Sequence, residues 1–158
     1  MLGCRYNPDL DVIRYLVEHH QMDINYVTEY KTSCAMLGCW ENRNLGVVKY
    51  LIENQSHSID QADDFGNTCL IYASMNPNIE IMKYLIEQRG ADVNHLNDEG
   101  LSCLTIGPLY DPNIEKAGYL YEMTEIEMNI IGLPVEHWVK IILSMGQNYL
   151  RFKEFLDR

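Results

Sequence analysis

The stretch MLGCWENRNLGVVKYLIE, residues 36–53, decides the fold because the chain contains four related copies of it. Residues 1–18, MLGCRYNPDLDVIRYLVE, align with it at an offset of 35. Its second half returns as NPNIEIMKYLIE at residues 76–87 and as DPNIEKAGYLYE at residues 111–122. A motif that recurs every 34 or 35 residues is typical of stacked repeats, because a single unit cannot bury its own apolar face.

Each of the first three copies contains the pattern of an amphipathic helix, in which apolar pairs spaced by four residues lie on one face. These pairs are Val12-Ile13 and Leu16-Val17, Val47-Val48 and Leu51-Ile52, and Ile81-Met82 and Leu85-Ile86. Charged residues recur in phase on the other face, at Arg14, Lys49 and Lys83 and at Glu18, Glu53, Glu87 and Glu122. We expect these charged residues to form a surface that faces water.

A second motif precedes this helix and resembles the ankyrin repeat. The ankyrin signature T-P-L-H-x-A corresponds to TCLIYA at residues 68–73, and the ankyrin ending G-A-D-V-N is literal at residues 90–94. The resemblance implies an all-α solenoid of helix-turn-helix units joined by β-hairpin-like fingers, with turn glycines at Gly66 and Gly100. It covers residues 1–129, which we divide into copies at 1–25 (partial), 26–60, 61–94 and 95–129 (degenerate).

Some residues depart from the signature. Cysteine replaces its proline at positions 34, 69 and 103, while Ile71 and Thr105 replace its histidine and weaken the hydrogen bond which that histidine makes. We expect the five cysteines to be reduced thiols. Cys34 and Cys39 are five residues apart, about 140° round a helix, so they point away from a common ligand. No metal site or other cofactor is expected.

The two ends of the chain differ from its centre. The first copy begins at its inner helix, so we expect either further upstream repeats or self-association at this end. In the fourth copy Lys116 replaces the apolar Ile81, and Pro108 and Pro112 interrupt the first half. Residues 130–158 fit no repeat and predict a two-helix C-terminal cap.

An alternative for this C-terminal segment concerns function. Residues 133–136, LPVE, followed by ILS at residues 142–144, resemble the start of an F-box. Some viral ankyrin proteins carry an F-box-like tail that recruits a ubiquitin-ligase adaptor. The resemblance therefore implies a second candidate function, a substrate-recognition adaptor for a ubiquitin ligase. The Asn-, Ile- and Tyr-rich composition of the repeats is also similar to that of viral or effector ankyrin proteins.

Composition and charge bear on the partner and the location. The net charge of −11 and the scattered 12 basic residues argue against a nucleic-acid or membrane partner. No apolar run could span a bilayer, and no signal peptide is recognisable. We expect an intracellular, cytoplasmic protein, in the host cytoplasm if the source is a virus or an effector.

The sequence favours binding over catalysis. Residues 64–66, DFG, are the letters of a kinase motif, but the glycine loop, strand lysine and H-R-D loop of kinases are missing. No nucleophile motif is recognisable either, so we predict a non-enzymatic module that binds a protein partner.

In the ankyrin family, partners lie on the concave face formed by finger tips and inner helices. The residues at the matching positions are Glu29, Tyr30, Thr32, Trp40, Asp64, Phe65, Asn67, Met75, Asp98, Glu99 and Leu101. Aromatic residues beside carboxylates are a suitable mixture for an interface. An alternative stays open: Tyr30 and Phe65 pack between adjacent fingers, and Trp40 is a packing residue.

Overall fold

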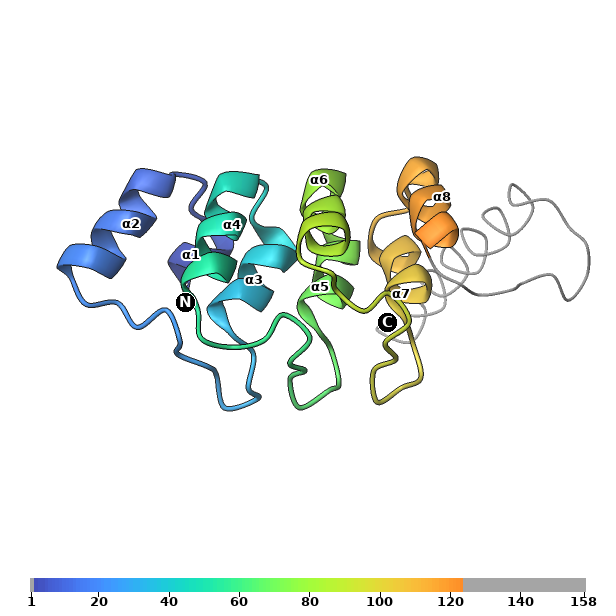
Figure 1. Cartoon of the computed structure of the whole chain (residues 1–158), viewed down its shortest axis with the longest axis horizontal. Coiled ribbons are helices and arrows are strands. Elements are labelled where there is room, and N and C mark those ends of the chain that lie inside the picture. Colours follow the sequence, from blue (N-terminus) through green and yellow to red (C-terminus); the bar gives the residue numbers. More distant parts are fainter. Residues whose placement is uncertain (1, 124–158) are drawn as a thin grey trace, which may run out of the picture.

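The computed structural model describes residues 2–123, which form a row of helix pairs (Figure 1). Each pair has an inner and an outer helix that run back to back. The pairs are α1 (Leu2–Tyr6) with α2 (Leu10–His19), α3 (Cys34–Glu41) with α4 (Leu45–Asn54), α5 (Cys69–Met75) with α6 (Ile79–Lys83), and α7 (Cys103–Tyr110) with α8 (Ile114–Met123). The π-helical turn η1 (Tyr84–Gln88) extends α6. The described residues contain no strand, which confirms the all-α class.

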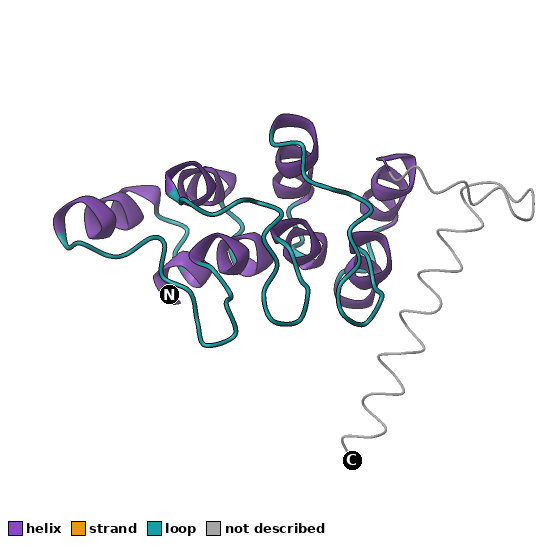
Figure 2. Cartoon of the chain, turned by 60° about the horizontal axis from the view of Figure 1, so that its bottom comes forward, coloured by secondary structure: helices purple, strands orange, loops and turns teal. Residues whose placement is uncertain are grey.

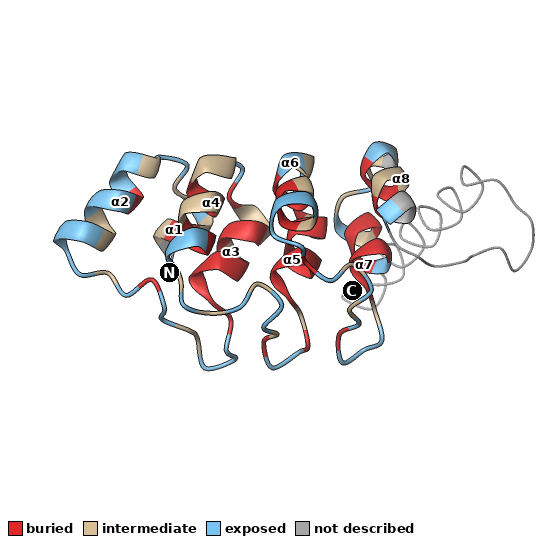
Figure 3. Ribbon diagram, in the orientation of Figure 1, coloured by how far each residue is buried: buried red, intermediate tan, exposed pale blue. Residues whose placement is uncertain are grey.

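The core lies between neighbouring pairs. The inner helices pack on one another in the order α1, α3, α5 and α7, and Figure 3 shows that most of α3 and nearly all of α5 are buried. The predicted apolar stripes of the second and third copies point into this core, where Leu51 and Leu85 are fully inaccessible to solvent. In the first copy the prediction was partly wrong, since Ile13 is buried but Val12 is 39% exposed. Replacing either leucine by alanine should cost about 2–5 kcal/mol, as for other core leucines.

Asparagine side chains tie each repeat to the one before it. The Asn42 amide donates to the carbonyl oxygens of Cys4 (3.1 Å) and Asn7 (2.7 Å), at the end of α1. The Asn76 amide donates in the same way to the carbonyl oxygens of Cys39 (2.9 Å) and Asn42 (3.0 Å), at the end of α3. These carbonyls have no partner within their own helix, so each asparagine satisfies groups that burial would otherwise leave unpaired.

The fourth repeat replaces this asparagine by an ion pair. Asp111 stands in the position of Asn76, and the buried ammonium of Lys116 donates to Asp111 Oδ2 at 2.6 Å. The same ammonium donates to the carbonyl oxygens of Ser74 (2.9 Å) and Asn76, at the end of α5. Burial lowers the pKa of Lys116, against the opposing effect of Asp111. Lys116, which the sequence analysis interpreted as a loss of the apolar stripe, therefore donates the hydrogen bonds that an asparagine amide donates in the preceding repeats.

Pro108 does not interrupt the fourth repeat, so this part of the prediction was wrong. Helix α7 continues through Pro108 and ends at Tyr110. Pro108 lies near the end of this short helix and is buried, so packing compensates for the hydrogen bond that its missing N–H cannot make.

The charged outer face is also more connected than expected. Glu53 accepts a hydrogen bond from the Tyr84 hydroxyl at 3.1 Å, and Glu87 accepts one from the Tyr119 hydroxyl at 2.9 Å. In both cases the tyrosine belongs to the next repeat. Desolvation, followed by the hydrogen bond to Glu53, raises the pKa of Tyr84 to about 12. These glutamates therefore link repeats and do not only face water.

The cysteines are packing residues, and all five are buried as free thiols. Cys34 and Cys39 do not face each other: Cys34 lies beside Cys4, and Cys39 lies beside Cys69 of the next repeat. Burial raises the pKa of the Cys103 thiol to about 12, which suppresses its nucleophilic thiolate form.

At the signature histidine position, other groups partly restore the hydrogen bond. The Ser102 N–H donates to Thr105 Oγ1 at 2.8 Å, and the Ser33 N–H donates to the Met36 sulfur at 3.3 Å. The threonine hydroxyl also donates to the Ser102 carbonyl at 3.0 Å. The start of α7 therefore keeps a polar cap without histidine.

Fingers project from the same side of the stack (Figure 2). Their tips lie at Lys31, Gly66 and Gly100, which share a left-handed backbone with φ of 59°, 76° and 73°. Successive fingers are joined by backbone hydrogen bonds, from the Asp64 N–H to the Tyr30 carbonyl (3.0 Å) and from the Asp98 N–H to the Phe65 carbonyl (3.1 Å). The fingers thus form a continuous row beside the inner helices.

Four predictions are not tested by these observations. The C-terminal cap at residues 130–158 and the F-box-like segment lie outside the described residues. The repeat boundaries and the expectation for the N-terminal end stay predictions. Among the described helices, none combines the length and apolar character that crossing a membrane requires.

Candidate interaction surface

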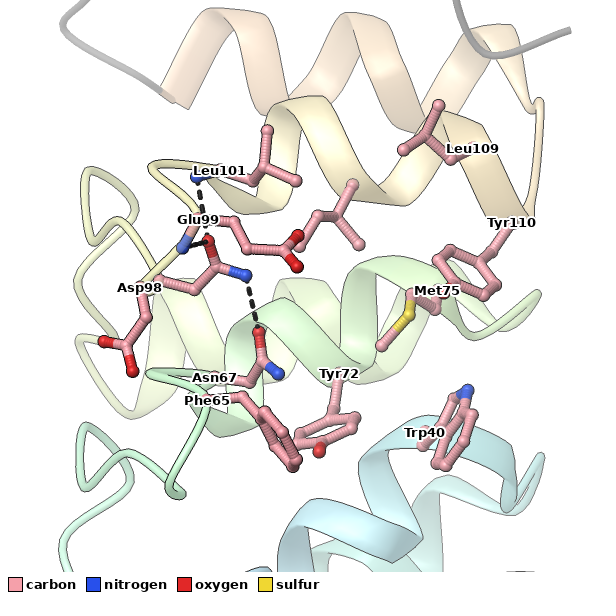
Figure 4. A pocket seen from close by; sticks show the side chains of 12 residues that line it. Trp40, Phe65, Asn67, Tyr72, Met75, Asp98, Glu99, Leu101, Leu109 and Tyr110 are labelled. Atoms are coloured by element: carbon pink, nitrogen blue, oxygen red, sulfur yellow. Dashed lines mark hydrogen bonds between the residues drawn. The ribbon is translucent and has the colours of Figure 1, made fainter. Parts of the chain in front are cut away.

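A cavity of about 490 Å³ lies where fingers and inner helices of three consecutive repeats meet (Figure 4). Its lining combines aromatic and aliphatic side chains with amides and two carboxylates. The lining residues are Trp40, Phe65, Asn67, Tyr72, Met75, Asn97, Asp98, Glu99, Leu101, Ile106, Leu109 and Tyr110. This volume is within the range of about 300–1,000 Å³ that small-ligand sites occupy.

Tyr72 of α5 is held in the lining by a buried carboxylate. Its hydroxyl donates to Asp63 Oδ2 at 2.6 Å, while Asp63 Oδ1 accepts from the N–H groups of Phe65 (3.0 Å) and Asn67 (2.9 Å). Burial, followed by the bond to Asp63, raises the pKa of Tyr72. The residue is therefore a neutral phenol that connects the second finger to its inner helix.

Asn97 arranges the third finger in the same way. Its Oδ1 accepts from the N–H groups of Glu99 (3.1 Å) and Leu101 (2.9 Å), and its amide donates to Asn67 Oδ1 at 3.0 Å (Figure 4). Because Asn97 is buried and both its amide and its side-chain oxygen are hydrogen-bonded, it fixes Glu99 and Leu101 relative to the second finger. The cavity wall is thus preformed rather than assembled from loose loops.

Trp40 packs against neighbouring side chains, as one of the two alternatives expects, and it also lines the cavity. The guanidinium of Arg5 lies over its ring at 4.2 Å from the centroid, and the Tyr72 ring lies 5.7 Å away. Arg5 is in turn paired with Glu41. The indole is half-buried by these contacts and still contributes to the cavity surface.

Tyr30 and Phe65 likewise pack against each other and stay partly exposed. Their rings contact each other across adjacent fingers, with centroids 5.6 Å apart. Tyr30 nevertheless remains 52% exposed and Phe65 53% exposed. The contact fixes the orientation of both rings while leaving about half of each available to a partner.

The cavity contains seven of the eleven predicted binding residues, namely Trp40, Phe65, Asn67, Met75, Asp98, Glu99 and Leu101. The other four lie nearby in the row of fingers. Glu29 is exposed, Tyr30 stacks on Phe65, and Asp64 pairs with Lys31 at 2.6 Å. Thr32 is buried, and its N–H donates to Thr28 Oγ1 at 3.1 Å, so it braces the first finger.

The prediction missed five lining residues: Tyr72, Asn97, Ile106, Leu109 and Tyr110. Leu109 continues the register of Trp40 and Met75, so the repeat spacing alone could have identified it. Tyr72 lies three residues before Met75, one helical turn away on the same face. Tyr110 occupies a position that the third repeat lacks, so no register pointed to it.

The lining offers apolar contact area, hydrogen-bonding amides and negative charge. It contains two carboxylates, and among the described residues that line it there is no lysine or arginine. Within residues 2–123, no group of three or more His, Cys, Asp or Glu side chains is placed to hold a metal ion. Aromatic side chains together with hydrogen-bonding groups are typical of protein interfaces.

Comparison with known proteins gives the family. Residues 36–130, more than half of the chain, match the family model that describes three copies of the ankyrin repeat. Among curated proteins, none shows significant sequence similarity to the chain. Ankyrin repeats generally serve as protein–protein interaction modules, in which an extended concave surface receives the partner. The register of the copies, the helix pairs and this match agree that the chain belongs to the ankyrin-repeat family.

Proposed function

We propose that the protein is a non-enzymatic interaction module that binds a protein partner on its concave face, at the cavity between Trp40 and Tyr110. The observation that carries the proposal is the preformed cavity of about 490 Å³ lined from three consecutive repeats. Three repeats contribute because α3, α5 and α7 each supply side chains. A partner that fills the cavity would therefore contact several repeats at once.

The exposed aromatic rings beside the cavity support this choice of face. Phe65 and Tyr110 line the cavity and remain 53% and 58% exposed, respectively. Large aromatic side chains at the centre of an interface commonly dominate binding energy, because they bury much area at a small entropic cost. Tyr30 extends the same aromatic surface along the fingers.

Affinity capture from a candidate host lysate tests the proposal, with Tyr30→Ala/Phe65→Ala as the decisive variant. Both rings are half-exposed, so their truncation should leave the core intact while removing partner contacts. Trp40 is left unchanged because Arg5 and Tyr72 pack on it. We expect the captured partner to be lost or weakened at least tenfold, in line with the loss of two interface aromatics.

Tyr15→Ala/Tyr26→Ala is the matched control. These tyrosines are 55% and 54% exposed and lie outside the cavity lining. The control should retain the partner. If both double variants retain it equally, the concave face is not the binding surface.

The ubiquitin-ligase adaptor function stays a prediction from residues 133–144, which lie outside the described part of the chain. Its test is separate: a pull-down with the ligase adaptor that is lost in Pro134→Ala/Glu136→Ala.

A further inference from the structure

The cavity has an apolar side and an acidic side. Met75, Leu101 and Ile106 contribute aliphatic surface, and Phe65 and Tyr72 contribute aromatic surface. Figure 4 shows the Glu99 carboxylate directed into the cavity, between Leu101 and Tyr72, whereas the Asp98 carboxylate points away. Glu99 is therefore the charged group that a bound side chain would meet.

The charge on Glu99 is not neutralised within the described residues. Its own N–H is occupied by Asn97, but no ion pair among residues 2–123 involves its carboxylate. The basic residues near the concave face are engaged elsewhere, because Lys31 pairs with Asp64 and Arg5 pairs with Glu41. A net charge of −11 for the whole chain strengthens the negative potential at this position.

We propose that the cavity receives one arginine or lysine side chain from an extended segment of the protein partner. Glu99 contacts the cation, while Met75, Leu101 and Ile106 cover the methylene groups of the same side chain. Long basic side chains combine these two parts, since their stems are apolar and only their ends are charged. The inference rests on the proposed function and specifies what the partner must present.

The protein's own Arg5 illustrates the compatibility of this surface with a cation. Its guanidinium lies 4.2 Å from the centroid of the Trp40 ring and also pairs with Glu41. An arginine thus already uses an aromatic ring and a glutamate together beside the cavity. Phe65 or Tyr72 with Glu99 offers the same combination to a partner.

The test uses the full chain and the peptide acetyl-Ala-Leu-Arg-Leu-Ala-amide, titrated while amide and indole NMR signals are recorded. Matched peptides carry lysine, glutamate or citrulline in place of arginine, and citrulline keeps the shape of arginine without its charge. We expect the arginine and lysine peptides to shift the Trp40 indole and Leu101 amide signals. The citrulline peptide should bind about tenfold more weakly, and the glutamate peptide not measurably.

Glu99→Gln is the decisive variant, because it removes the charge and keeps the size of the side chain. It should abolish the preference of arginine over citrulline. Glu115→Gln changes the net charge by the same amount at an exposed position on α8 and should preserve the preference. This control separates a contact with Glu99 from the general attraction of an acidic protein.

The outcomes distinguish the inference from the proposed function. If the citrulline peptide shifts the same signals with equal affinity, the cavity binds peptides but the basic side chain is the wrong occupant. If every peptide shifts signals elsewhere or none at millimolar concentration, the inference fails. The capture experiment with Tyr30→Ala/Phe65→Ala then decides separately whether the concave face binds any partner.

Discussion

Asn76 and Lys116 act at two successive junctions of the stack. The Asn76 amide bonds the free carbonyls at the end of α3, and the Lys116 ammonium bonds the corresponding carbonyls at the end of α5. The first junction uses a neutral group, whereas the second uses a cation that also needs Asp111. The shared requirement is therefore a hydrogen-bond donor for buried carbonyls, and the chemistry of the donor can vary.

The difference has an energetic consequence. A buried neutral amide loses much less solvation than a buried ammonium, which is costly unless its partners compensate. Lys116 and Asp111 should therefore depend on each other, while Asn76 acts alone. The tyrosine–glutamate bonds on the outer face are the same at both junctions, so they do not explain any difference in behaviour.

Lys116→Ile should destabilise the second of these junctions strongly. The substitution leaves the Ser74 and Asn76 carbonyls without their donor and leaves Asp111 as an unpaired carboxylate. We expect the free energy of unfolding to fall by about 2–3 kcal/mol, less than for a fully buried pair because Asp111 is partly exposed. Urea denaturation followed by circular dichroism measures the change.

The control for this variant is Lys83→Ile on the preceding outer helix. Lys83 pairs with Glu80 at the surface, at 3.1 Å, and bonds no buried carbonyl. Its loss should lower the unfolding midpoint only slightly. Equal losses in the two variants would show that Lys116 contributes no more than an ordinary surface lysine.

Asp111→Asn/Lys116→Ile should recover most of the stability that Lys116→Ile loses. The double substitution recreates the residues of the preceding junction, where Asn76 is followed by Ile81. We expect unfolding within about 1 kcal/mol of the original chain and a coupling energy of about 1–3 kcal/mol in the double-mutant cycle. Strictly additive losses would mean that the two junctions are not interchangeable.

Gly66→Ala and Gly100→Ala extend the comparison to the fingers of the same junctions. Both glycines have positive φ, but a Cβ on Gly66 would lie 2.6 Å from the Asp98 backbone nitrogen, while one on Gly100 would meet no described atom within 4 Å. We expect a loss of about 2–3 kcal/mol at Gly66 and about 1 kcal/mol at Gly100. Thermal unfolding of both variants measures the difference, and equal losses would show that contact between fingers adds nothing to the backbone strain.

The repeated parts of the fold could be predicted from sequence because equivalent residues recur at a constant spacing of 34 or 35 residues. The apolar pairs predicted the buried stripe correctly in the second and third copies, down to Leu51 and Leu85, whereas Val12 of the first copy is exposed. Gly66 and Gly100 were recognised as turn residues of the polar linkers, and both adopt the left-handed backbone that favours glycine. Most of the cavity lining followed from the same register.

The features that the sequence analysis missed depend on contacts between repeats or on positions that have no equivalent in the other copies. Considered by itself, Lys116 was interpreted as the loss of an apolar residue from the stripe. Its role appears only when Asp111 and the carbonyls of the previous repeat are considered with it. Pro108 was judged by its effect on an isolated helix, whereas burial in α7 decides its cost. Tyr110 lines the cavity from a position that has no equivalent in the third repeat, so the spacing contained no signal for it.

Lys31→Gly is expected to change the stability least. It tests whether the ion pair between Lys31 and Asp64 compensates for a non-glycine residue in a left-handed backbone. Lys31 adopts the left-handed backbone that Gly66 and Gly100 adopt, with φ of 59°, and it pairs with Asp64 of the next finger at 2.6 Å. Glycine would relieve the backbone strain but lose the ion pair, so the melting temperature should hardly change. In an Asp64→Asn background, where no ion pair remains to be lost, the same substitution should raise the melting temperature by a few degrees. An identical change in both backgrounds would show that the Lys31–Asp64 pair does not offset the strain, unlike the Lys116–Asp111 pair, which replaces a missing amide.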